Sequence, residues 1–195
     1  NTCKKWCKIF NGSVGIMIEN FNYKVVKNFI TEEEVKLFNY WCEIKHRTNM
    51  KYFDIDQSDN ADSYFYGDPI MDSLLLKTTS KVSEIVNHKL LPCYSFTRIY
   101  TKFGDLKKHI DRPSCELSAT LHIGSDGTKW PIFMDGEPIE LGKGDCAIYR
   151  GTKVNHWREE FNGDWYAQVF LHWVLADGKY SDYYKDKRQY FGMRK

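Results

Sequence analysis

The chain has 195 residues, of which 42% are hydrophobic and 16% aromatic, a composition that is typical of an ordered globular protein and excludes a disordered one. Its length favours one domain with a core of its own. Lys and Arg number 28 against 26 Asp and Glu, and this near balance gives no reason to expect a nucleic-acid partner. No apolar run is long enough to span a bilayer, so we expect a soluble, cytoplasmic protein with no membrane partner.

The beginning of the chain differs from the rest. Residues 1–16 lack the apolar stretch of a secretory signal, and we interpret them as an N-terminal extension that is poorly ordered or not native. Residues 17–195 are predicted to form a single domain. A chain with its own core does not need disulfides, so we expect free thiols at all six cysteines, which are Cys3, Cys7, Cys42, Cys93, Cys115 and Cys146.

The first half of the domain, residues 17–90, is predicted to be mainly helical. Thr31-Glu32-Glu33-Glu34 has the pattern of a capping box, and apolar residues then follow at helical spacing, which predicts a helix over residues 32–46. A second helix is predicted from Pro69 to about His88. Residues 48–68 between them are polar and contain several Asp and Tyr, so we expect a long loop that could serve as a substrate lid.

The second half changes to a β pattern, with short segments separated by Gly- and Asp-rich turns. This order predicts an α+β, mainly β fold: a double-stranded β-helix, that is, a jelly-roll or cupin-like barrel, over residues 91–176, backed by the two N-terminal helices. Residues 177–195 are expected to be a solvated tail. The predicted strands are residues 93–102, 116–123, 130–134, 138–141, 145–150, 153–157 and 165–175.

Three residues in this half are competent to bind a metal. Alternate side chains of a strand share a face, so His109 and Asp111 are predicted to point the same way and to grip one ion. His156, 45 residues further along, would complete a set of two imidazoles and one carboxylate. Such a set leaves half of an octahedron open, which suits Fe(II) beside a second, bidentate ligand. The alternative is an exposed His109 and a hydrogen-bonded core residue at His156.

Further motifs accompany these three residues: Arg98-Ile99-Tyr100, Gly104, Gly144-Asp145 and the closing strand from Gln168 to Trp173. With them, the stretch from about Phe96 to Val174 resembles the prolyl 4-hydroxylase-like branch of the 2-oxoglutarate/Fe(II)-dependent dioxygenases. The resemblance implies that His109, Asp111 and His156 bind Fe(II), that 2-oxoglutarate and O2 are co-substrates, and that a C–H bond is hydroxylated while 2-oxoglutarate becomes succinate.

The resemblance also implies contacts to 2-oxoglutarate, and here the chain departs from the family. Tyr100 stands where the family has a contacting tyrosine, and His122 is expected to touch the distal carboxylate. The family's Lys or Arg, nine to eleven residues after the second His, is replaced by Trp165-Tyr166-Ala167. A buried carboxylate still needs a cation or several donors. We therefore expect Arg158, and after it Arg98, to supply the cation; Tyr166 and Gln168 could add hydrogen bonds, and Arg150 is a weaker candidate.

The substrate is the least determined part of the prediction. The resemblance favours a peptide or protein substrate, hydroxylated on a residue such as proline; a free amino acid or another small metabolite is the alternative. Two rival functions use the same residues. One is a non-catalytic, metal-binding cupin-like module, and the other is a zinc hydrolase with Glu116 or Glu159 as general base. The basic stretch at residues 185–188 raises a nucleic-acid option, but no patterned set of basic and aromatic residues supports it.

Overall fold

A computed structural model describes residues 18–48 and 61–193 of the chain. Ten strands, two α-helices and three short 3-10 helices make up this part. The elements in chain order are the 3-10 helix Ile18–Asn20, β1 Tyr23–Val26, α1 Glu32–Arg47, β2 Ala61–Tyr66, α2 Pro69–Val86, β3 Leu90–Thr101, β4 Leu106–His109, the 3-10 helix Pro113–Cys115, β5 Leu117–Ser125, β6 Ile132–Met134, β7 Glu137–Ile139, β8 Cys146–Tyr149, β9 His156–Arg158, β10 Trp165–Leu175 and the 3-10 helix Ser181–Lys187.

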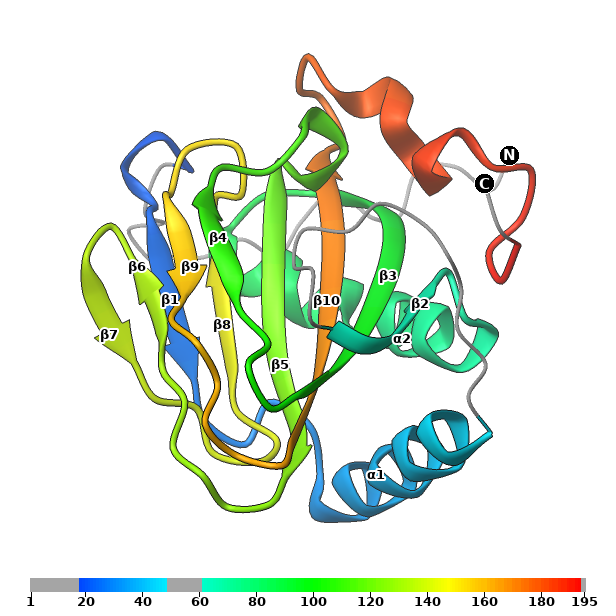
Figure 1. Cartoon of the computed structure of the whole chain (residues 1–195). Coiled ribbons are helices and arrows are strands. Elements are labelled where there is room, and N and C mark those ends of the chain that lie inside the picture. The colour runs from blue at the N-terminus through cyan, green and yellow to red at the C-terminus, as the bar shows by residue number, and fades with distance from the viewer. Residues whose placement is uncertain (1–17, 49–60, 194–195) are drawn as a thin grey trace.

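The strands form two antiparallel sheets that face each other. The larger sheet has the order β1-β8-β5-β10-β3-β2, and the smaller sheet has the order β4-β9-β6-β7. Figure 1 shows both helices on one side of the larger sheet and the smaller sheet on the other side. This is the predicted double-stranded β-helix with two helices behind it, so the predicted fold class is confirmed. Within the described residues no helix is both long enough and apolar enough to cross a membrane.

Both helices begin where the sequence predicts. The Thr31 hydroxyl accepts from the Glu34 amide at 3.2 Å and the Glu34 carboxylate accepts from the Thr31 amide at 3.0 Å, which is the expected capping box. Asp68 caps α2, whose first residue is Pro69. The second helix ends at Val86 because Asn87 adopts a left-handed conformation, two residues earlier than predicted.

Strand alternation gives the larger sheet two different faces. Its outer face is apolar and packs on the helices, through side chains such as Ile99, Leu121, Val169, Leu171 and Trp173. The side chains that alternate with these point to the smaller sheet, and many are polar or aromatic: Tyr100, Ser118, Thr120, His122, Tyr166, Gln168 and His172. The helix-covered face therefore supplies most of the main hydrophobic core, and the inner face can hold polar side chains that bind ligands.

Two parts of the chain differ from the sequence-based expectation. Residues 61–66 of the expected loop form β2, which pairs with β3 at the edge of the larger sheet. Residues 49–60, the rest of the proposed lid, lie outside the described residues, as do residues 1–16. The expectation of a solvated tail was wrong. Asp186 and Arg188 are buried, and Arg188 forms an ion pair at 3.0 Å with Asp72 of α2.

The cysteine prediction can be followed for four thiols. Cys42, Cys93, Cys115 and Cys146 are buried and free. Cys3 and Cys7 lie outside the described residues.

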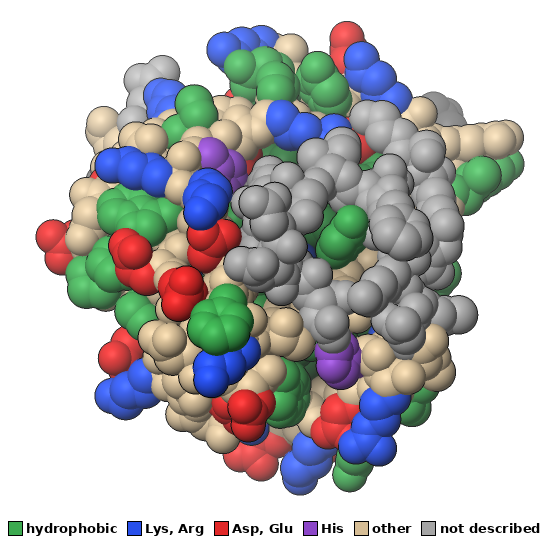
Figure 2. Space-filling model, in the orientation of Figure 1, with side chains coloured by type: hydrophobic (Ala, Val, Ile, Leu, Met, Phe, Trp, Pro, Cys, Tyr) green, Lys and Arg blue, Asp and Glu red, His purple; other side chains and the backbone are tan. Residues whose placement is uncertain are grey.

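On the face shown in Figure 2, basic and acidic side chains of the described residues are interspersed, and neither sign gathers into a patch of the kind that binds a phosphate backbone.

The docked tail leads to a stability prediction. Arg188→Met is expected to lower the free energy of unfolding by about 3 kcal/mol, because the buried Asp72 carboxylate loses its cation. Urea denaturation followed by circular dichroism measures this. Lys129→Met is the control, since its ion pair with Glu140 is largely exposed and should change the value by less than about 0.5 kcal/mol. An equally small effect of Arg188→Met would show that the tail is undocked in solution.

Candidate active site

The two predicted histidines meet across the smaller sheet. His109 is the last residue of β4 and His156 the first of β9, and the two are directly opposite in the antiparallel register. Their ring centroids lie 4.3 Å apart. One oxygen of Asp111, Oδ1, lies 3.5 Å from Nε2 of each histidine. The structure thus brings the three residues together, with potential ligand atoms within 4.8 Å of one another.

Each imidazole is oriented by its other nitrogen. Nδ1 of His109 lies 2.6 Å from the Lys107 carbonyl oxygen, and Nδ1 of His156 lies 3.1 Å from the Val154 carbonyl oxygen. A proton on each Nδ1 makes these hydrogen bonds and leaves Nε2 with its lone pair toward Asp111. This is the usual way in which a protein fixes the tautomer and ring orientation of a metal-binding histidine.

Asp111 is placed by contacts other than the predicted strand alternation. It lies two residues beyond the end of β4, and its backbone amide donates to the Gly151 carbonyl at 2.7 Å. The Ser118 hydroxyl donates to its second carboxylate oxygen, Oδ2, at 2.7 Å. The same hydroxyl lies 2.9 Å from Nδ1 of His172, which therefore donates to it. This chain of hydrogen bonds turns Oδ1 toward the two imidazoles.

Gly151 is a site residue that the sequence analysis missed. A Cβ atom at this position would overlap the Asp111 carboxylate, the Cys115 carbonyl oxygen and the Ser118 hydroxyl. Only glycine allows the backbone to approach the carboxylate so closely. The only signal in the sequence is a glycine five residues before His156, and by itself it does not indicate this contact. Ser118 and His172 were equally hard to assign, because their roles depend on pairing between distant strands.

The electrostatics of the three residues favour a cation. Burial by itself raises the pKa of Asp111, but hydrogen bonds with His109 and His156 and charge interactions with His156 and His172 outweigh it and hold this pKa well below its usual range. Burial by itself lowers the pKa of His109, yet the Asp111 carboxylate and the Lys107 carbonyl more than compensate, so this pKa is raised. The site therefore carries a buried negative charge beside two nitrogen donors.

This donor set fits a divalent transition metal. Two imidazole nitrogens and one carboxylate oxygen on one side leave the opposite side open, which is the arrangement of non-haem Fe(II) oxygenases. A second group, Asp111 with Cys115 and His172, also has suitable atom types. However, the Ser118 hydroxyl already bridges Asp111 and His172, and burial raises the pKa of the Cys115 thiol. We interpret this second group as the support of Asp111.

Four of the residues predicted to contact 2-oxoglutarate have buried polar atoms without a hydrogen-bond partner among the described residues, and one of these atoms is Nε2 of His122. The Tyr100 hydroxyl, Oε1 of Gln168, and Nε and Nη2 of Arg158 are buried and have no hydrogen-bond partner among the described residues. Buried polar atoms are almost always paired. Such a group on the inner face of the barrel, beside the metal-competent residues, is suited to a polar ligand that brings its own hydrogen-bonding atoms.

Arg158 is held on two sides by aromatic rings. The centre of its guanidinium lies 4.5 Å from the Trp130 ring centroid and 5.0 Å from that of Tyr166. Nη1 also donates to the Trp130 carbonyl oxygen. Arg158 shares a strand face with His156, two residues away, so both point into the barrel. Arg98 is buried too, with its guanidinium 4.7 Å from the Tyr100 ring centroid.

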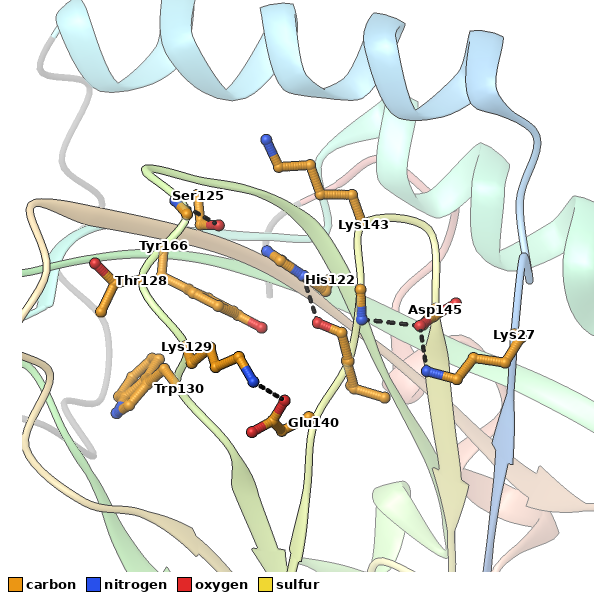
Figure 3. Close-up of a pocket in the computed structure, with 13 residues that line it drawn as sticks. Lys27, His122, Ser125, Thr128, Lys129, Trp130, Glu140, Lys143, Asp145 and Tyr166 are labelled. Carbon is orange, nitrogen blue, oxygen red and sulfur yellow. Dashed lines mark hydrogen bonds and ion pairs between the residues drawn. The ribbon is translucent and has the colours of Figure 1, made fainter.

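A cavity of about 370 Å³ is lined in part by Trp130 and Tyr166, the two rings that contact Arg158. His122 and Tyr166 stack in its wall with centroids 4.2 Å apart, and Figure 3 shows the Tyr166 hydroxyl pointing into the cavity near the Lys129 side chain. Nδ1 of His122 lies 2.9 Å from the Leu141 carbonyl oxygen. His122 and Tyr166 thus form part of the wall of this cavity.

The other candidate residues are engaged elsewhere. Arg150 donates to the Ile18 carbonyl at 2.9 Å. Of the two candidate bases of a zinc hydrolase, Glu116 accepts from the Leu175 amide at 2.9 Å and Glu159 accepts from the Trp157 indole at 3.0 Å. These contacts give neither carboxylate a role beside the three metal-competent residues.

Comparison with known proteins shows the fold. No protein-family model and no curated protein sequence matches the chain. A Pseudomonas putida prolyl-4-hydroxylase structure matches with a TM-score of 0.61 and 12% identity, covering 80% of this chain and 94% of that one. The carbocyclase SnoK from nogalamycin biosynthesis gives 0.67 and 12%, over 83% and 82%. HygX from Streptomyces hygroscopicus, with nickel and 2-oxoglutarate bound, gives 0.64 and 10%, over 82% and 85%. The chain has the fold of the prolyl 4-hydroxylase-like 2-oxoglutarate oxygenases.

The Ser118 contact gives a test of the metal centre. Ser118→Ala should weaken metal binding by about 10- to 100-fold, because the Asp111 carboxylate loses the hydroxyl that orients it. Anaerobic titration with Fe(II), or with Ni(II) in air, measures the change. Ser125→Ala is the control. Ser125 is the last residue of the same strand, β5, and its hydroxyl accepts a hydrogen bond from the Gly127 amide and has no contact with Asp111. Unchanged affinity in Ser118→Ala would contradict the assigned role of the hydroxyl.

Buried His122 should make the protein sensitive to acid. Burial lowers its pKa from 6.5 to about 4, so the unfolded chain takes up a proton below pH 6.5 while the folded protein does not until about pH 4. The free energy of unfolding should therefore fall by about 2 kcal/mol between pH 7 and pH 4.5 on account of this residue.

The variant His122→Asn isolates this effect. Asparagine keeps a donor for the Leu141 carbonyl but does not titrate, so urea denaturation at the two pH values should show a smaller loss than in the unchanged protein. The variant His88→Asn, at a half-exposed position, should lose as much stability as the unchanged protein does. An identical loss in His122→Asn and His88→Asn would refute the assignment.

Proposed function

We propose that the chain is a 2-oxoglutarate- and Fe(II)-dependent oxygenase that hydroxylates an unactivated C–H bond. The observation that carries the proposal is the convergence of His109, Asp111 and His156, with both Nε2 atoms directed at one carboxylate oxygen. When bound, Fe(II) and 2-oxoglutarate supply the oxidation of the C–H bond by O2, with conversion of 2-oxoglutarate to succinate. The protein binds the metal on one side, leaves the other side open and surrounds it with a buried pocket.

We further propose that Arg158 pairs with the distal carboxylate of 2-oxoglutarate. The unpartnered Nε and Nη2 atoms support this, because a guanidinium with two free donors suits a carboxylate, and the Tyr100 hydroxyl offers a third donor. In this arrangement the cation comes from β9, and Tyr166 lies beside it where a Lys or Arg on β10 was expected. Arg98 remains the second candidate.

The proposed substrate is a peptidyl residue such as proline. The prolyl-4-hydroxylase among the similar structures supports this substrate, and a row of aromatic rings formed by Tyr64, Phe96 and Phe170 on the inner side of the larger sheet could contact it. A free amino acid or other small metabolite is the alternative. The carbocyclase SnoK, which belongs to nogalamycin biosynthesis, favours that reading.

The deciding experiment is an anaerobic titration of the Fe(II)-loaded protein with 2-oxoglutarate, followed in the visible spectrum. Chelation should produce a weak charge-transfer band, and His109→Ala should abolish it together with Fe(II) binding. Arg158→Met should leave Fe(II) affinity unchanged and raise the 2-oxoglutarate concentration needed for half of the band by about 100-fold, because two charge-assisted hydrogen bonds are lost.

The controls separate the outcomes. Arg150→Met should titrate as the unchanged protein does, since Arg150 is bonded to the Ile18 carbonyl. A loss in Arg98→Met in place of Arg158→Met would move the role to Arg98. Absence of the band in iron-loaded protein would refute the oxygenase and favour a non-catalytic metal-binding module. Once the band is established, succinate formation with proline-containing peptides, compared with free proline, distinguishes the two substrate classes.

A further inference from the structure

Helix α1 carries an apolar stripe on the side that faces away from the protein. Leu37, Tyr40 and Ile44 lie three and four residues apart, so they follow one another along one face of the helix. Their exposed fractions are 57%, 65% and 62%. The opposite face of the helix already fills its packing role, with Phe38 and Cys42 in the main core. The three residues of the exposed stripe are therefore not part of the main core.

Opposite charges stand at the two ends of the stripe. Glu33 lies seven residues before Tyr40 and Arg47 lies seven residues after it, and both are exposed. Seven residues are almost two helical turns, so all five residues share one face. Among the described residues Glu33 has no ion-pair partner. Among the same residues Arg47 has one loose ion-pair contact, 3.9 Å to Glu43, and the Arg47 side chain remains 80% exposed.

This order of residues is complementary to itself when the direction of the helix is reversed. Read from either end, the face runs from a charge through three apolar side chains to the opposite charge. In an antiparallel pair of such helices, Glu33 of one copy meets Arg47 of the other at both ends. Leu37 meets Ile44, and Tyr40 meets Tyr40 on the axis. A parallel pair would instead place like charges together, which is unfavourable.

We propose that two copies of this chain associate through α1, antiparallel, around a two-fold axis at Tyr40. Such an interface is isologous, because the same surface is used on both copies. It consists of one helix from each side and so buries less than the roughly 800 Å² per partner of a standard stable complex. The dimer is therefore weak and reversible, and it forms at micromolar or higher concentration. The apolar residues drive association, and the charges fix the direction.

Sedimentation velocity over a range of protein concentrations provides the first test. The unchanged protein should shift from monomer toward dimer as its concentration rises. Tyr40→Glu should remain monomeric at all concentrations, because it places two carboxylates together on the axis. Leu76→Glu is the matched control, since Leu76 is an exposed apolar residue of α2, 45% exposed, and this variant should dimerise as before. Circular dichroism checks that each variant is folded.

Exchanging the charges tests the antiparallel arrangement itself. Glu33→Arg alone places two arginines together at each end of the dimer, and Arg47→Glu alone places two glutamates together. Each should weaken dimerisation by about 10-fold or more, with stronger effects at low salt. An equimolar mixture of the two variants should recover it, because every end of the mixed dimer again pairs an arginine with a glutamate.

Three results would overturn the proposal. One is an unchanged protein that stays monomeric at several hundred micromolar. Another is a dimer that persists in Tyr40→Glu, which would place the interface elsewhere. The third is a mixture of Glu33→Arg and Arg47→Glu that associates no better than either variant alone. None of these measurements depends on metal or 2-oxoglutarate, so they are independent of the proposed oxygenase activity.

Discussion

The buried carboxylate of Asp111 is the group on which the arrangement of the site depends. A carboxylate taken out of water must be compensated by a cation or by several donors. Here Ser118 provides one strong donor, and the two imidazoles present nitrogens that become donors only when protonated. The Asp111 carboxylate therefore places a buried negative charge beside two imidazole nitrogens. A divalent cation bound as proposed would neutralise this charge, and the close approach of the Gly151 backbone restricts the carboxylate from the other side.

The division of the larger sheet into two faces allows such a site to exist. Along β10, Val169 and Leu171 pack beneath the helices, while Gln168 and His172, which flank them, face the smaller sheet. A polar residue on the outer face would remove apolar contacts from the main core, but on the inner face it costs little once it is hydrogen-bonded. The residues that support Asp111, those proposed to contact 2-oxoglutarate and part of the cavity wall can therefore all lie on one side of strands whose other side packs in the main core.

Much of this organisation could be predicted from local sequence, and the rest depends on distant pairing. The strand at 165–175 and the capping box at Thr31 are determined by residues within each segment, and both were predicted correctly. Strand β2 was missed because its polar surroundings look like a loop, and it is a strand only because the edge of β3 is available to pair with it. The docking of Arg188 was equally hidden, since its partner Asp72 lies on a helix more than a hundred residues away.

The metal-competent residues and the residues proposed to bind 2-oxoglutarate differ in how closely the sequence restricts the choice, for a geometric reason. His109 and Asp111 are close in sequence, and His156 had few competitors in a chain with 6 histidines. The position of the basic side chain proposed to pair with 2-oxoglutarate is less constrained, because the inner faces of several strands converge on the same space in a barrel. A guanidinium from β9 can therefore reach the region that a side chain from β10 would reach. Tyr166 then packs against the Arg158 guanidinium together with Trp130. A buried arginine keeps its charge, whereas a buried lysine tends to lose its proton. A cation supplied from this buried position on β9 is therefore better suited to arginine than to lysine.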